Sequence, residues 1–195
     1  DVTDEDDNCS TGIEASFVDV LTDGSCEGTH IITRTWSLVD KCGNAAADQV
    51  QTITILDTIA PSFTLPIDIE IYSGENCDYD ISVENTGDVT DESDNCSVGL
   101  QAEYSDISIS RICQGTWLII RIWSLEDNCG NKAEDQYQII TVYDTIAPSF
   151  TRPEDITIYT DADCVYDASI DITGDVSNEN DNCSTDIEAS FSDVI

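Results

Sequence analysis

Clustered acidic residues are the part of this sequence best suited to chemistry. The stretch DVTDESDN at 88–95 places Asp88, Asp91, Glu92 and Asp94 within eight residues. Repulsion among these carboxylates destabilises a loop unless a cation bridges them, and Ca²⁺ takes about six to eight such oxygens. The spacing differs from that of an EF-hand, and no glycine stands where that loop needs one. A calcium site here therefore needs ligands from other parts of the chain.

Two other loops supply suitable carboxylates. Asp57 follows a predicted strand, and Asp127 lies in the loop EDNCGNK at 126–132. The predicted calcium ligands of this site are Asp57, Asp88, Asp91, Asp94, Asn95 and Asp127. Equivalent positions elsewhere in the chain add Asp4, Asp7 and Asp40, and then Asp144, Asp175, Glu179 and Asp181. The alternative is an acidic surface that is simply solvated.

The acids recur because the sequence is repetitive. The motifs DVTDEDDNCS, DVTDESDNCS and DVSNENDNCS begin at positions 1, 88 and 175, a constant spacing of 87, and DTIAPSFT occurs at 57–64 and again at 144–151. We therefore expect a partial repeat at 1–56, a complete repeat at 57–143 and a partial repeat at 144–195. Such a pattern indicates a window of a longer tandem array.

The cysteines keep the same spacing. The chain has nine cysteines, and a full repeat carries four, at the positions of Cys77, Cys96, Cys113 and Cys129. A zinc site is disfavoured because the sequence has no CxxC pair and a single histidine, His30. Paired cysteines instead indicate disulfides and an oxidising compartment.

Alternation of apolar and polar residues predicts strands to hold these loops. We expect strands around Ile69–Ile71 (with 156–158 as its copy), 77–86, 100–104, 117–126 and 136–143. Short strands joined by Gly, Asp and Asn loops favour an all-β fold of tandem immunoglobulin-like antiparallel β-sandwiches, about 87 residues each and arranged end to end. We expect the recurring Arg34 and Arg121 to pair with acids or stack on rings.

The same topology predicts a disulfide pattern. In an immunoglobulin-like sandwich the strand after Cys77 and the strand after Cys113 begin at one end of the domain, and both end near Cys96 and Cys129. The predicted pairs are therefore Cys77–Cys113, Cys96–Cys129 and the copy of the latter, Cys9–Cys42.

The motifs CGN and DTIAP, with TGDVTDE and DNCS, resemble the hyalin-like (HYR-like) repeats of bacterial cell-surface, SprB-type gliding-motility adhesins of Flavobacterium-like bacteria. The resemblance implies an extracellular, outer-membrane-associated filament exported by type IX secretion. Its partners would be a solid surface or polysaccharide and the motility machinery of the cell envelope. It also implies O-glycosylation at Thr58 and Thr145, each in a DTI motif, which competes with calcium as the role of this segment.

Composition narrows the function further. A net charge of −35 disfavours nucleic acid as a partner, and no apolar run is long enough for a transmembrane segment. We expect no enzyme, because carboxylates repeated every 87 residues indicate a recurring structural role. Two interpretations remain: a stiff stalk, or modules that themselves bind a surface or carbohydrate with avidity.

Overall fold

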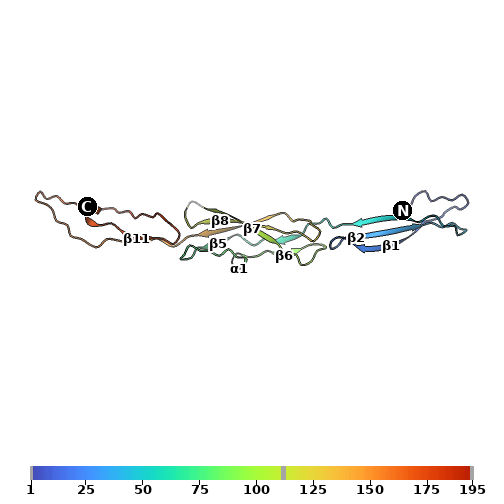
Figure 1. Ribbon diagram of the computed structural model, residues 1–195, viewed down its shortest axis with the longest axis horizontal. Helices are drawn as coiled ribbons and strands as arrows, with labels where there is room; N and C mark the ends of the chain where they lie inside the picture. Colours follow the sequence, from blue (N-terminus) through green and yellow to red (C-terminus); the bar gives the residue numbers. More distant parts are fainter. Residues whose placement is uncertain (1, 111–112, 194–195) are drawn as a thin grey trace. The chain divides into compact units, whose positions relative to one another are not determined.

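The computed structural model describes residues 2–110 and 113–193 (Figure 1). These residues form several β-sheets and two short helical turns, so the prediction of a mainly β, largely antiparallel fold is confirmed. They cluster into two compact units. The first holds Asp1–Thr64, Val89–Glu103 and Ser124–Asp135, and the second holds Leu65–Asp88, Tyr104–Trp123 and Gln136–Ile195.

In the first unit, three consecutive strands form an antiparallel sheet (Figure 1). They are β1 (Ser16–Asp23), β2 (His30–Ser37) and β3 (Gln49–Ile55), and every residue of β1 has a partner on β2. Arg34 on β2 forms an ion pair with Asp19 on β1 and lies over the ring of Phe17. The expected partners of this arginine, an acid and a ring, are thus confirmed. Asp57 follows the end of β3 by two residues.

The first unit also contains a short two-stranded sheet, and one of its strands lies within the acidic stretch 88–95. Strand β4 (Ser62–Thr64) pairs with β6 (Thr90–Ser93), with a register shift between its two ends. The acidic stretch predicted as a loop is thus partly a strand. Phe63 is buried on β4. Asp94 is the first residue after β6, so the sheet fixes where its side chain starts.

The second unit is built on a four-stranded sheet in the order β5-β9-β8-β7. Its strands are β5 (Ile69–Tyr72), β9 (Gln136–Tyr143), β8 (Trp117–Ser124) and β7 (Glu103–Ser110). Strands β8 and β9 are antiparallel, whereas β5 runs parallel to β9. The core consists of Ile71, Ile119, Ile140 and Val142. Along β8, Ile119 and Trp123 are buried, as is Leu125 just beyond its end.

The segment 77–86, beside this sheet, is held by hydrogen bonds from polar side chains and not by pairing with another strand. The prediction of a strand at 77–86 is wrong: the segment is irregular and ends in the helical turn α1 (Val83–Thr86). Arg121 donates to the carbonyl oxygen of Ile81 at 2.6 Å, and Gln138 donates to that of Thr86 at 2.7 Å. Because side chains donate hydrogen bonds to these two carbonyl oxygens, the segment does not need to pair with a neighbouring strand.

The third copy repeats part of this structure. Strand β10 (Ser149–Thr151) pairs with β11 (Ser177–Asn180) as β4 pairs with β6, and α2 (Ile170–Thr173) corresponds to α1. The predicted strand at 156–158 is absent. Its counterpart β5 pairs with β9.

Candidate metal centre

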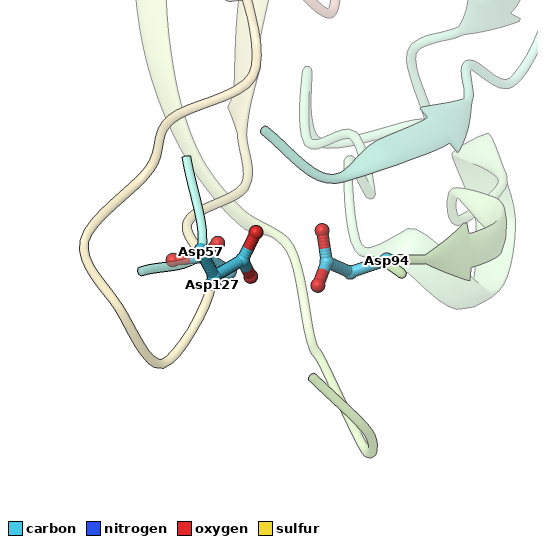
Figure 2. Close-up of side chains that lie close together, drawn as sticks. All are labelled: Asp57, Asp94 and Asp127. Atoms are coloured by element: carbon cyan, nitrogen blue, oxygen red, sulfur yellow. The ribbon is translucent and has the colours of Figure 1, made fainter. Parts of the chain in front are cut away.

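Three carboxylates from separate segments meet in the first unit. One oxygen each of Asp57, Asp94 and Asp127 lies within 4.8 Å of the others. Figure 2 shows Asp94 on the side opposite Asp57 and Asp127, with its carboxylate directed toward them. Asp57 and Asp127 are only 9% and 5% exposed. The sequence prediction that these three residues converge is confirmed.

The local backbone holds each carboxylate by one oxygen. Asp94 Oδ2 accepts the backbone N–H groups of Cys96 and Ser97, both at 2.8 Å. Asp57 Oδ1 accepts the N–H of Ile59 at 3.1 Å, in the turn that begins DTIAP. Aspartate favours such turns because its short side chain reaches N–H groups two or three residues ahead. These turns fix the carboxylates without using all of their oxygens.

Asp127 is held more fully. Its Oδ1 accepts the N–H groups of Cys129 and Asn131, both at 2.8 Å, and its Oδ2 accepts the side-chain amide of Asn131 at 2.7 Å. Burial raises the pKa of the Asp127 carboxyl, but the hydrogen bonds from Asn131 and from Cys129 lower it by more, so that this pKa lies below its ordinary value. Asp127 therefore carries a negative charge at neutral pH.

Two oxygens of the cluster are left without hydrogen bonds. Asp57 Oδ2 and Asp94 Oδ1 are buried and find no partner within the described part of the chain. A buried, unpaired carboxylate oxygen is costly, and the cost grows when other carboxylates lie nearby. Burial, together with the negative charges of Asp57 and Asp94, raises the pKa of the adjacent Cys96 thiol. A cation would satisfy both oxygens at once.

The geometry and the donor type fit a hard cation. Two oxygens that are each about 2.3–2.6 Å from one ion lie at most about 5 Å apart. The three aspartates meet this limit. An all-oxygen set suits Ca²⁺, Mg²⁺ or Mn²⁺ better than metals that prefer nitrogen or sulfur. The cluster is therefore able to bind a metal ion.

Three other predicted ligands of this site are placed elsewhere or act differently. Asp88 belongs to the second compact unit. Asp91 is exposed, has a φ of 57° and accepts the Thr90 hydroxyl. Asn95 was expected to offer a carbonyl oxygen, yet its amide nitrogen donates to Asp57 Oδ1 at 3.3 Å. It thus supports Asp57 as a donor.

The first copy repeats two of the aspartate turns. Asp7 Oδ2 accepts the N–H groups of Cys9 and Ser10, as Asp94 does one copy later. Asp40 accepts from Cys42 and Asn44, as Asp127 does. Asp4 matches Asp91 in its positive φ, at 62°.

The third copy also repeats some of these aspartate turns. Asp144 Oδ1 accepts the N–H of Ile146 at 3.1 Å, as Asp57 does from Ile59. Asp181 Oδ2 accepts the N–H groups of Cys183 and Ser184. Asp175 Oδ1 accepts the N–H of the next residue, Val176. Across the described residues, only Asp57, Asp94 and Asp127 form a complete group of three.

Glutamate has a separate role in these loops. Glu179, a predicted ligand, accepts the N–H of Ala189 at 2.6 Å. Glu5 and Glu92 accept from Ala15 and Ala102 in the same way. A contact repeated in all three copies closes the loop that follows the acidic stretch, which explains the glutamates without a metal.

The disulfides differ from the prediction. Cys26 is bonded to Cys129, and Cys77 to Cys183. The predicted pairs Cys77–Cys113 and Cys96–Cys129 are therefore wrong, and Cys9 and Cys42 of the third predicted pair are free. The error has a physical origin: with no strand at 77–86, the assumed ends of the sandwich do not bring those cysteines together. The two bonds still indicate an oxidising extracellular or periplasmic environment.

No family model, curated protein or solved structure matches this chain. Among the described residues, no helix is long and apolar enough to cross a membrane. Thr58 and Thr145, the residues named as glycosylation acceptors, are both exposed.

Proposed function

We propose that this chain is a structural segment of a long, secreted cell-surface filament used in surface adhesion and gliding motility. Its 87-residue repeats would be immunoglobulin-like modules placed end to end, and their function would follow from length and stiffness. The recurrence of the same acids, cysteines and turns in successive copies supports a structural role. The two disulfides fit secretion.

We further propose that Ca²⁺ binds at Asp57, Asp94 and Asp127 and stiffens the repeat. The observation that carries this proposal is the pair of buried, unpartnered oxygens, Asp57 Oδ2 and Asp94 Oδ1, within the three-carboxylate cluster. Ca²⁺ suits the site better than Mg²⁺ because it tolerates irregular oxygen geometry, and water can complete its shell. Asp57 begins the copy that also holds Asp94 and Asp127, and it follows β3, the last strand of the preceding copy, by two residues. The ion would thus hold the point where the chain enters a copy to two loops of that copy.

Calorimetric titration with CaCl₂ after chelator treatment tests the calcium proposal. We expect saturable binding at one site per chain, a higher melting temperature with Ca²⁺ and a weaker response to Mg²⁺. Absence of binding heat at millimolar Ca²⁺, together with an unchanged melting temperature, would overturn the metal site and leave a solvated acidic cluster.

Adhesion of beads coated with this chain separates the stalk from the alternative that the repeats bind surfaces themselves. A stalk predicts no more attachment to glass or to polysaccharide films than beads coated with an unrelated acidic protein show. Attachment that increases with the density of the chain on the bead would favour the binding-module interpretation.

A further inference from the structure

Both disulfides join different copies of the repeat. Cys26 belongs to the first copy and Cys129 to the second, and Cys77 belongs to the second and Cys183 to the third. Their Cα atoms are 5.2 and 5.0 Å apart, in the ordinary range for disulfides. The two bonds are not copies of each other, because they use different cysteine positions of the repeat.

The repeat spacing defines the two bond types. Cys26 corresponds to Cys113, so the first bond links a Cys113-type residue to the Cys129-type residue of the next copy. Cys183 corresponds to Cys96, so the second bond links a Cys77-type residue to the Cys96-type residue of the next copy. Together the two types use all four cysteines of a repeat, each once.

The surroundings of the two bonds show that both belong to one kind of junction. In the first unit, Glu27 accepts the N–H of Val98 at 3.1 Å, and Gln114 accepts that of Thr185 at 2.5 Å in the second. Glu27 and Gln114 are equivalent positions, as are Val98 and Thr185. The same loop of one copy therefore meets the same loop of the next in both units.

Two equivalent glycines, Gly28 and Gly115, support the equivalence of the two junctions. A side chain on Gly28 would collide with Cys96, and a side chain on its equivalent Gly115 would collide with Cys183. Both glycines have positive φ, 74° and 79°, which other residues rarely adopt. The junction in the first unit thus holds an unbonded Cys96 beside the Cys26–Cys129 bond. The junction in the second holds an unbonded Cys113 beside the Cys77–Cys183 bond.

We propose that adjacent copies are joined by two parallel disulfides at every junction, one of each type. Each repeat would then bond to the preceding copy through its Cys96- and Cys129-type residues and to the following copy through its Cys77- and Cys113-type residues. The free cysteines agree with this rule, since the rule places each of their partners before residue 1 or after residue 195. They are Cys9, Cys42, Cys96, Cys113 and Cys164.

Each bond forms by oxidation of two thiols. Two protons and two electrons leave the cysteine pair, and a disulfide oxidant such as oxidised glutathione accepts them by thiol–disulfide exchange, becoming two thiols. The inference does not depend on the metal site or on the adhesive role, because it rests on the bonds and contacts of the junctions alone.

A chain lengthened by one repeat tests the proposal. In the lengthened chain, a second copy of residues 109–195 is appended after Ile195, so that the repeat spacing continues and four cysteines are added. After oxidation with a glutathione redox buffer, we expect two additional disulfides, Cys113 to the added Cys129 and Cys164 to the added Cys183. The number of titratable thiols stays at the five of the original chain.

Peptide mapping without reduction reads the pairs directly. In the lengthened chain, Cys113→Ser should remove one added bond, leave the added Cys129 as a free thiol and keep the bond of Cys164. The proposal fails if Cys113 bonds to Cys77, if Cys96 bonds to Cys129, or if Cys113 and Cys164 still react with iodoacetamide in the folded, oxidised chain.

Discussion

Arg121 and Asp106 form a bidentate ion pair, with Nε and Nη2 of the arginine donating to the two carboxylate oxygens at 2.8 and 2.9 Å. The arginine side chain is 1% exposed and also donates to the hydroxyl of Thr86 at 2.7 Å. Its guanidinium lies 4.2 Å from the centre of the Tyr104 ring. One residue thus links β7, β8 and α1.

Asp106→Ala should strongly destabilise the second unit. The substitution leaves the Arg121 charge buried without its carboxylate, a change that typically costs about 3–5 kcal/mol. Urea denaturation followed by tryptophan fluorescence measures the loss. The equivalent pair Arg34–Asp19 is the matched control, because its side chains are 25% and 34% exposed. Asp19→Ala should therefore cost much less. Equal losses for the two variants would contradict this account.

Asp94→Asn should separate a metal site from a hydrogen-bonded turn. The asparagine oxygen can still accept the N–H groups of Cys96 and Ser97, so the turn is preserved. With chelator present, loss of one negative charge should raise the melting temperature. With Ca²⁺ present, loss of one carboxylate ligand should weaken affinity by about tenfold or more.

Asp91→Asn is the control for this substitution. Asp91 lies in the same acidic stretch, is exposed and is not a member of the three-carboxylate cluster. It should leave calcium affinity within about twofold of the original chain. If Asp91→Asn and Asp94→Asn reduce affinity equally, Ca²⁺ is attracted by the general charge of the segment and not held by Asp57, Asp94 and Asp127.

Cys26→Ser should destabilise the first unit, because the Cys26–Cys129 bond closes a loop with a sequence separation of 103. In the chain-entropy model, a loop of about 100 residues is worth about 4.7 kcal/mol. Cys9→Ser, which removes an exposed free cysteine, should change stability by no more than about 0.5 kcal/mol. Urea denaturation of both variants checks the difference. A Cys26→Ser variant as stable as Cys9→Ser would show that the bond does not constrain the chain.

The sequence predicted those features that depend on local pattern or on repetition. Strand β9 matches its predicted range of 136–143, because its alternating apolar residues end at the turn that begins DTIAP. The convergence of Asp57, Asp94 and Asp127 followed from placing three loops at one end of a strand framework. For β9, the determinant lies within the strand and the turn that follows it.

The rest depends on contacts that alternation cannot reveal. Tyr79 and Ile81 do pack against the core, so their apolar spacing was informative, but the backbone there is held by Arg121 and Gln138 and forms no strand. The disulfides were missed for another reason. Cys129 could pair with a cysteine of its own copy or of the preceding copy, and repeats with the same cysteine positions give no local signal to decide between them.

Stability in acid should depend on Asp80, whose Oδ1 accepts the N–H of Ser82, the residue immediately before α1, at 2.8 Å. Hydrogen bonds from the backbone and side chain of Ser82 hold the pKa of the Asp80 carboxyl below its ordinary value. The unfolded chain has an aspartate pKa of about 3.9. The contribution of Asp80 is therefore fully present above about pH 5 and is lost as the pH falls below about 4, through the folded pKa.

Melting temperatures of the original chain and of Asp80→Ala, measured at pH 6 and at pH 2.5, test this prediction. The difference between them should be positive at pH 6 and should shrink toward zero at pH 2.5. The net charge of −35 also titrates over this range, but it changes almost equally in the two proteins and cancels in the difference. Glu154→Ala, which removes an exposed carboxylate, controls for the loss of one charge. A difference that persists unchanged at pH 2.5 would mean that Asp80 acts through packing, since the hydrogen bond to the ionised carboxylate weakens as the carboxyl group is protonated.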